Sequence, residues 1–234
     1  MSRTKSYFLF ILGVATALGI AWLVRQRRKE AGSLRIWQQV LIERHGAEKA
    51  GQLAAAVRQQ NAALVAETPL PENQTLRWHL KENILPGLAL YRVLLHEHAG
   101  NQQTALAEVD EAFRARTLAK NRLLLAPLKM LPAPFPLFKL AFAQMMKKFP
   151  AEGWDFTYVA NDDDQVAFNA TRCFYLNTLA ACGAPELTAS FCKNDDVMAK
   201  LFPPSIRFVR PHTLGRGDTV CGFQYCRVEK FRNR

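Results

Sequence analysis

The chain has 234 residues, 49% of them hydrophobic, and a formal net charge of +11. This length can bury a core without disulfides, and the five cysteines form no CxxC pair, which excludes a disulfide-rich secreted domain. Seven Lys or Arg and one Glu lie in the first 35 residues, so +6 of the charge is local and +5 remains for the rest. A surplus this small argues against a nucleic-acid partner.

An uncharged apolar stretch at residues 7–24 has about the length needed to cross a bilayer. The basic segment 25–29 follows it directly and no small-x-small cleavage site intervenes, so we interpret the stretch as a membrane anchor rather than a signal peptide. Positive charge is denser after the stretch than before it. The sequence therefore predicts a single-pass membrane protein with an anchor and basic flank at 1–32 and its C-terminal body in the cytoplasm.

Residues 33–150 are predicted to be helical. Apolar side chains recur at helical spacing over 33–66, with a break near Gly46, and again over 71–98 and 102–120. These amphipathic segments are expected to pack on the body of the protein.

The apolar stretch 123–149 contains four prolines, which exclude a continuous membrane-spanning helix. Its later part, 138–149, has aromatic and Met residues at helical spacing with lysines elsewhere. This pattern is compatible with a core helix, with a helix that covers an active site, or with one that rests on a bilayer.

Residues 151–234 change to strand character. The segments 154–160 and 165–170 flank an acidic turn and predict a hairpin, two short helices follow, and two more strands are expected at 205–210 and 219–228 around a tight turn. The predicted fold class is α+β, with a transmembrane helix, a helical N-terminal half, and a mostly antiparallel sheet that carries two helices. Residues 33–234 are expected to form one domain.

Chemically capable side chains concentrate in this last region, and the candidates are Asn169, Arg172, Cys173, Glu186, Cys192, Asp195, Arg210, Thr213 and Cys221. Cys173 is predicted to open a helix, where backbone amides and the helix dipole lower a thiol's pKa. A buried packing role for any single cysteine fits the same pattern. Histidines 45, 79, 96, 98 and 212 show no metal-ligand spacing.

Cys192 and Asp195 are three residues apart, so they share one face of a predicted helix, where the carboxylate can handle a proton. A helix-capping role for Asp195 remains open. Arg210 and Thr213 follow the next strand, where they can bind a substrate carboxylate or simply pair across strands. Cys221 lies on the last strand, on the opposite face from Cys226.

Three blocks carry a resemblance to a known family: FNATRCFY at 168–175, GAPELTASFCKNDD at 183–196 and RFVRPHTLGRGDTVCGFQY at 207–225. The region resembles the L-2-amino-thiazoline-4-carboxylic acid hydrolase family. The resemblance implies hydrolysis of a carbon–nitrogen or carbon–sulfur bond in a small ring, as in the opening of a cyclic thiazoline amidine to an N-carbamoyl cysteine. Family members usually have an aspartate after the last cysteine, where this chain has Gly222.

The leading hypothesis is a membrane-anchored hydrolase of a small cyclic amidine or amide, with Cys192, Asp195 and Cys173 as catalytic residues. Asn169, Arg172, Arg210, Thr213 and Cys221 are the predicted substrate-binding residues, and no cofactor is required. In one version Cys192 or Cys173 attacks as thiolate. In another, Cys173, Cys192 and Cys221 ligate a zinc that activates water. The alternative is a non-catalytic ligand-binding or scaffold protein at the inner membrane face, which the departure at Gly222 favours.

Overall fold

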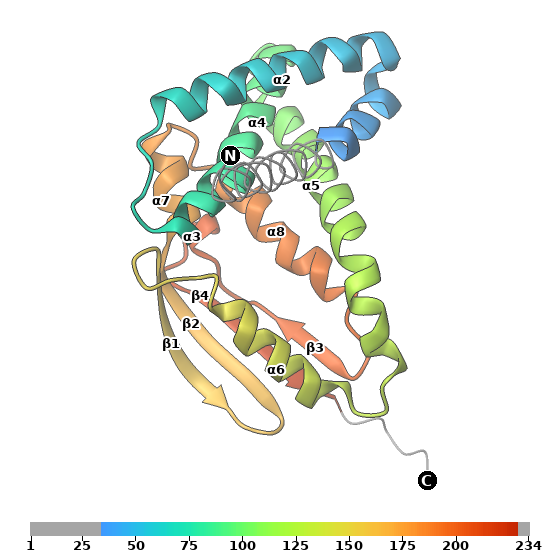
Figure 1. Cartoon of the computed structure of the whole chain (residues 1–234), viewed down its shortest axis with the longest axis vertical. Helices are drawn as coiled ribbons and strands as arrows, with labels where there is room; N and C mark the ends of the chain where they lie inside the picture. The colour runs from blue at the N-terminus through green and yellow to red at the C-terminus, as the bar shows by residue number, and fades with distance from the viewer. Residues whose placement is uncertain (1–33, 229–234) are drawn as a thin grey trace, which may run out of the picture.

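The computed structural model describes residues 34–228, with helices gathered at one end and a sheet at the other (Figure 1). Residues 34–45 are helical, and the remaining α-helices are α2 (Ala47–Glu67), α3 (Gln74–His79), α4 (Leu85–Glu97), α5 (Gln102–Leu125), α6 (Pro134–Met146), α7 (Phe174–Ala181) and α8 (Leu187–Ala199). The strands are β1 (Trp154–Asn161), β2 (Gln165–Cys173), β3 (Ile206–Val209) and β4 (Cys221–Arg227). The helical N-terminal half and the antiparallel sheet are as predicted.

The sheet has the order β1-β2-β4-β3, and every neighbouring pair is antiparallel. The predicted hairpin of β1 and β2 is confirmed. Its turn is held by Asp162, whose Oδ1 accepts from the backbone amides of Asp164 and Gln165 at 2.9 Å each. The acidic cluster is thus turn chemistry. β4 lies between β2 and β3, so the last segment of the family-like sequence occupies the centre of the sheet.

The helical half encloses its own core, in which α2, α4 and α5 pack on one another. The break near Gly46 is confirmed, because Gly46 has φ 78°, a left-handed conformation that favours glycine, and α2 begins at the next residue. Leu88 and Leu94 of α4 are fully buried, as are Val109 of α5 and Leu187 of α8. Because α8 packs into this core through Leu187, the helical half holds the helix in place on the side away from the sheet.

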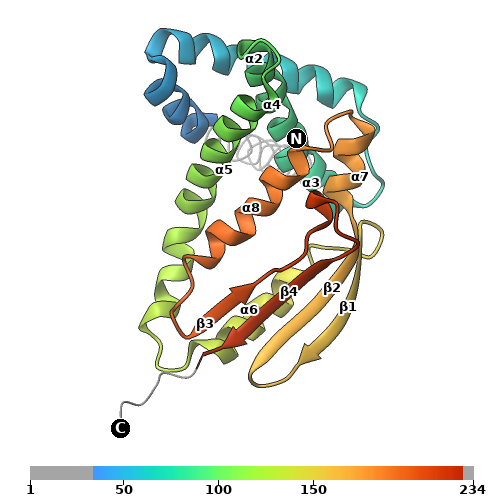
Figure 2. The same cartoon turned by 180° about the vertical axis from the view of Figure 1, so that it is seen from behind.

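Helix α6 lies across one face of the sheet, and Figure 2 shows the other face of the sheet from behind. Its buried aromatic residues, Phe135, Phe138 and Phe142, pack with Phe168 of β2 and Tyr225 of β4. The apolar stretch is therefore a core helix, which also covers the cavity described below. Leu137 and Leu140 of the same helix are exposed to solvent.

A π-helical turn, Leu80–Ile84, joins α3 to α4 and makes one continuous helical run. A π turn inserts one residue into the helical register, and such turns are frequent at functional sites. His79 directly precedes this turn and Asn83 lies within it, and both line the cavity described below. Sequence periodicity predicted the helix here but not the π turn.

The predicted transmembrane helix and the single-pass localisation are corrected here. Within residues 34–228, no helix is both long enough and apolar enough to cross a bilayer. The segment 7–24, on which the prediction depended, lies outside the described residues. The tight turn expected at 215–218 is present as a 3-10 turn, η3 (Leu214–Arg216), which ends at the left-handed Gly217, while the connection between β3 and β4 spans residues 210–220.

Candidate active site

A cavity of about 340 Å³ lies where α6, α8 and the sheet meet. Cys173, Cys192, Asp195, Arg210 and Cys221 all line it, from four different segments of the chain. Most of the other lining side chains are apolar or aromatic, and the further polar ones are those of His79, Asn83, Arg116, Thr188 and Asn194. The volume suits a small organic molecule.

Cys173 reaches the cavity because β2 is bulged. Phe156 pairs with Ala170 and Asp155 with Arg172, so one extra residue stands in β2 between these pairs. A bulge of this kind reverses the alternation of faces. Ala170 and Cys173, three residues apart, consequently both face the cavity, whereas strict alternation would place them on opposite faces.

Helix α8 supplies Cys192 and Asp195, one turn apart, and both line the cavity as their spacing predicted. The helix is held against η3 by close packing at Gly215. A Cβ at Gly215 would lie 3.1 Å from both Cys192 Sγ and Thr188 Cγ2. Glycine at this position therefore sets how near η3 comes to the cysteine.

Arg210 binds both aspartates at the end of α8. Its Nη1 donates to Asp195 Oδ2 at 2.7 Å, and its Nη2 donates to Asp196 Oδ2 at 2.9 Å and to the carbonyl of Cys192 at 2.8 Å. The guanidinium is only 2% exposed and lies 5.6 Å from the ring centroid of Phe223. Protein groups occupy both Nη atoms, whereas the buried Nε has no hydrogen-bond partner among the described residues, so the binding of a substrate carboxylate by Arg210 stays a prediction. The observed contacts of Arg210 orient Asp195.

Burial raises the pKa of Asp195 to about 6, although the Arg210 charge opposes the shift and Asp196 adds to it. Arg210 binds Oδ2 and leaves Oδ1 for a water molecule or a ligand. A carboxyl whose pKa lies near neutrality exchanges protons readily at working pH. Asp195 therefore has the position and the protonation behaviour of a general base.

Burial raises the pKa of all three cavity thiols, to about 12 for Cys192. The low pKa expected for Cys173 at the start of α7 is thus wrong in its net direction, because desolvation outweighs the backbone hydrogen bonds from Tyr175 and Leu176. Cys221 accepts a hydrogen bond from the backbone amide of Leu214 at 3.1 Å. The thiols are neutral donors in this arrangement rather than resting thiolates.

Two of the predicted binding residues lie on or beyond the outer face of the sheet. Asn169 pairs with Gly222 of β4, and its Oδ1 lies over that glycine, so it faces away from the cavity. Arg172 donates through Nη2 to the carbonyl of Ala151. Neither side chain lines the cavity.

Thr213 and Glu186 are also outside the cavity lining. The backbone amide of Thr213 donates to Asp218 Oδ2 at 2.7 Å, and its side chain is buried within the η3 connection. Glu186 accepts a 2.6 Å hydrogen bond from the hydroxyl of Tyr91 in the helical half. Both residues support the fold around the site.

The model of the L-2-amino-thiazoline-4-carboxylic acid hydrolase family matches residues 77–225, which include every cavity residue named above. The chain belongs to this family. No curated protein matches the chain. At the level of the family, a hydrolase-like function is therefore supported.

The similarity of this chain to solved structures is weak. An Fe(II) unliganded H-NOX protein from K. algicida is 13% identical, with 86% of this chain and 98% of that chain covered and a TM-score of 0.32. A point mutant of the same protein gives 12% identity, the same coverage and a TM-score of 0.34. Likeness at this level carries no argument about fold or function.

The hydrolase family blocks converge on the cavity, and the structure explains the departure at Gly222. Cys221 and Phe223 of β4 line the cavity, so Gly222 between them faces the other side. A Cβ there would meet Asn169 Oδ1 at 3.5 Å and Pro211 Cγ at 3.9 Å. A carboxylate at position 222 would therefore lie on the outer face, and its absence removes no group from the cavity.

Three cavity residues were missed by sequence reasoning: His79, Arg116 and Tyr175. His79 Nε2 lies 2.7 Å from the carbonyl of Lys148, so this nitrogen donates and Nδ1 accepts from the Tyr175 hydroxyl at 2.9 Å. Burial lowers the pKa of His79. Of the three, only Tyr175 lay within a recognised sequence block, since His79 and Arg116 are on helices whose pattern showed only an apolar face.

The zinc version of the site gains no support from this geometry. Among the described residues, the sulfur atoms of Cys173, Cys192 and Cys221 do not form a group of ligand atoms within 4.8 Å of one another. A zinc ion with three thiolate ligands needs them at about 2.3 Å from one centre. The reaction proposed below for this cavity therefore involves no metal ion.

Proposed function

We propose that this chain hydrolyses a small cyclic amidine that carries a carboxylate, as the family description implies, in the cavity at the end of α8. The observation that carries the proposal is the position of Asp195, which presents one free oxygen to a largely apolar cavity while Arg210 holds the other. A cavity that excludes most water strengthens each electrostatic interaction inside it.

In the proposed reaction Asp195 takes a proton from water, and the oxygen of that water attacks the amidine carbon between sulfur and nitrogen. The hydroxyl proton of the tetrahedral intermediate passes to the ring nitrogen as the carbon–oxygen bond becomes a urea carbonyl and the carbon–sulfur bond breaks. Protonated Asp195 then returns its proton to the departing sulfur. Cys192, with a pKa of about 12, supports this route as a neutral hydrogen-bond donor beside the reacting atoms. Attack by a thiolate is disfavoured by the same pKa.

Arg116 is the proposed partner of the substrate carboxylate. It lines the cavity from α5, and its Nη2 donates to Asn83 Oδ1 at 3.0 Å and to the carbonyl of Glu82 at 2.9 Å. These contacts hold the guanidinium at the cavity wall, where its positive charge attracts a carboxylate. Arg116→Met should raise KM more than it lowers kcat.

The test is an assay of the full chain with L-2-amino-thiazoline-4-carboxylate, in which the released thiol measures turnover. Asp195→Asn is expected to lower kcat by about 100-fold or more, the usual contribution of a general base. Asp196→Asn is the matched control, because Asp196 binds the same guanidinium but does not line the cavity. Equal losses in both variants would contradict the role of Asp195.

Cys192→Ser separates the two chemical routes, with Cys226→Ser as its control outside the cavity lining. A hydrogen-bond donor survives as serine with a modest loss, whereas a nucleophile does not, and a trapped adduct on Cys192 in mass spectrometry would establish thiolate attack. Binding of the compound without turnover by the wild-type chain would favour the ligand-binding alternative. Gly222 no longer favours that alternative, since it faces away from the cavity.

A further inference from the structure

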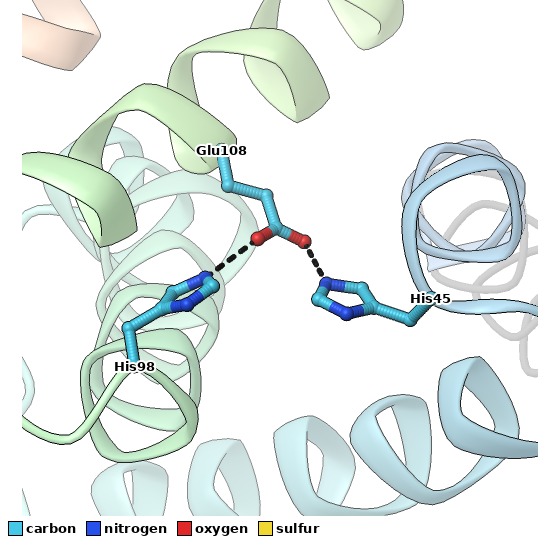
Figure 3. Close-up of side chains that lie close together, drawn as sticks. All are labelled: His45, His98 and Glu108. Carbon is cyan, nitrogen blue, oxygen red and sulfur yellow. Dashed lines mark hydrogen bonds and ion pairs between the residues drawn. The ribbon is translucent and has the colours of Figure 1, made fainter.

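Two histidine side chains meet at one glutamate carboxylate, and the three residues come from separate parts of the helical half, as Figure 3 shows. Glu108 of α5 faces His45, at the end of the helix over 34–45, and His98, at the end of α4. His45 Nε2 lies 2.6 Å from Glu108 Oε1, and His98 Nε2 lies 2.8 Å from Oε2. None of the three lines the cavity of the candidate active site.

The burial of Glu108 makes this cluster unusual. The carboxylate is completely buried, and glutamate is almost never fully buried unless it is paired. The two imidazoles are partly exposed, 16% for His45 and 21% for His98 at the side chain, so the cluster can be reached from solvent. A fully buried acid with two solvent-reachable imidazoles has the layout of a binding site as well as that of a packing contact.

We propose that His45, His98 and Glu108 bind a divalent transition-metal ion that holds the three helices together. Two imidazoles and one carboxylate suit zinc, nickel, cobalt or iron(II), and do not suit magnesium, which requires oxygen ligands. Their ligand atoms already lie within 4.8 Å of one another.

The rearrangement that the ion requires is small. Ligand atoms at about 2.1 Å from one metal and at right angles to each other lie about 3.0 Å apart. The two imidazole–carboxylate separations of 2.6 and 2.8 Å would therefore open by a few tenths of an ångström, and the two imidazole nitrogens, within 4.8 Å of each other, would come to no more than about 4.2 Å apart. The remaining coordination positions would face the partly exposed side, where water can fill them.

Charged neighbours of the cluster are already paired. Glu97 binds Lys49 at 2.7 Å, and Arg44 binds Glu111. Because these pairs balance their own charges, the carboxylate of Glu108 is the local negative charge that faces the imidazoles. A divalent ion is thus matched by one fixed anionic ligand and two neutral ones.

The experiment is titration calorimetry of Zn²⁺ into the EDTA-treated, untagged full chain, with Mg²⁺ as a comparison ion. One Zn²⁺ per chain and no Mg²⁺ are expected to bind, and the melting temperature should rise by about 5–10 °C at a hundredfold excess over Kd. His98→Ala should weaken binding at least about 10-fold to 100-fold, the effect of losing even an outer partner of a metal ligand. His96→Ala is the matched control, because His96 is on the same helix but exposed and outside the cluster.

Absence of Zn²⁺ binding, or binding that His98→Ala leaves unchanged, overturns the proposal. The Co²⁺ spectrum of the wild-type chain provides a test that needs no variant, in case His98→Ala does not fold. Ligand-field bands without a sulfur charge-transfer band are expected from imidazole and carboxylate ligands. A sulfur charge-transfer band would place the ion on the thiols and contradict the assignment.

Discussion

Two carboxylates, the fully buried Glu108 in the helical half and the partly exposed Asp195 at the cavity, show how different surroundings give one functional group different roles. Both oxygens of Glu108 are bound by imidazoles, and its side chain has no exposed surface. Asp195 is bound through Oδ2 alone, lines the cavity and is 38% exposed. The first carboxylate is saturated by protein donors, whereas the second keeps an oxygen for chemistry.

The comparison teaches that burial alone does not identify a catalytic acid. An acid fully satisfied by protein groups contributes to stability, and its removal exposes unpaired partners. An acid held on one side in a cavity is destabilised as an anion, which gives it a pKa near neutrality. Each prediction below tests one side of this contrast, in order of decreasing effect on unfolding.

Glu108→Ala should lower the free energy of unfolding by about 3 kcal/mol, because it removes the buried partner of two imidazoles. Urea unfolding of the metal-free protein measures the effect. Glu111→Ala is the control, since Glu111 is 48% exposed in its pair with Arg44 and should change stability by less than about 1 kcal/mol. Similar effects in both variants would show that burial of the cluster has no energetic consequence.

Gly215→Ala should lower the free energy of unfolding by about 1–3 kcal/mol through overpacking against α8. The added Cβ would stand 3.1 Å from Cys192 Sγ and from Thr188, and 3.4 Å from the backbone nitrogen of Ala189, which cannot move aside easily. Turnover should fall as well, because η3 and the cysteine are displaced together. A fully active, equally stable variant would mean that this close packing does not shape the cavity.

Asp195→Asn should raise the free energy of unfolding at pH 8 by about 1 kcal/mol, after allowance for solvent screening, while it removes activity. The folded-state pKa of about 6 lies above the ordinary 3.8, so the native state holds the proton more tightly than the unfolded state. Stability of the wild type therefore falls as the pH rises through this window. The gain in Asp195→Asn should vanish below about pH 4, and urea unfolding at both pH values checks it.

Gly222→Asp should change kcat/KM by less than about threefold, the smallest effect of the set, since position 222 faces Asn169 on the outer side of the sheet. Steady-state kinetics of this variant beside the wild type measure the effect. A large gain in activity would show that the carboxylate at this position acts on the cavity after all.

Much of the fold followed from local patterns. Helical spacing, the break at Gly46 and the hairpin around Asp162 are each encoded within a few residues, and the structure confirms them. The turn near Gly215 is also present, but its packing on α8 was not predicted, because it is a contact between segments distant in sequence. The membrane anchor was predicted from a segment outside the described residues, and no helix over 34–228 can span a bilayer.

For the candidate site, residue types were easier to predict than their directions. Cys192 and Asp195 share a face because their spacing on one helix requires it, whereas Cys173 faces the cavity only through a bulge in β2 that alternation does not reveal. Arg210 was expected to bind substrate, and its two Nη atoms bind Asp195 and Asp196. The sequence shows that an arginine is present but does not show which carboxylates pair with it in the fold.

The sequence by itself determined the family, through the blocks that resemble it, and the α+β class, through the short-range spacing of apolar residues. It also identified the cysteines, the acid and the arginine of the site as residue types. Tertiary structure decided which side chains share a cavity, that burial raises the pKa of its thiols, and that His45 and His98 meet at Glu108. The physical reason is that desolvation and charge pairing depend on neighbours brought together from distant segments, and local spacing carries no record of them.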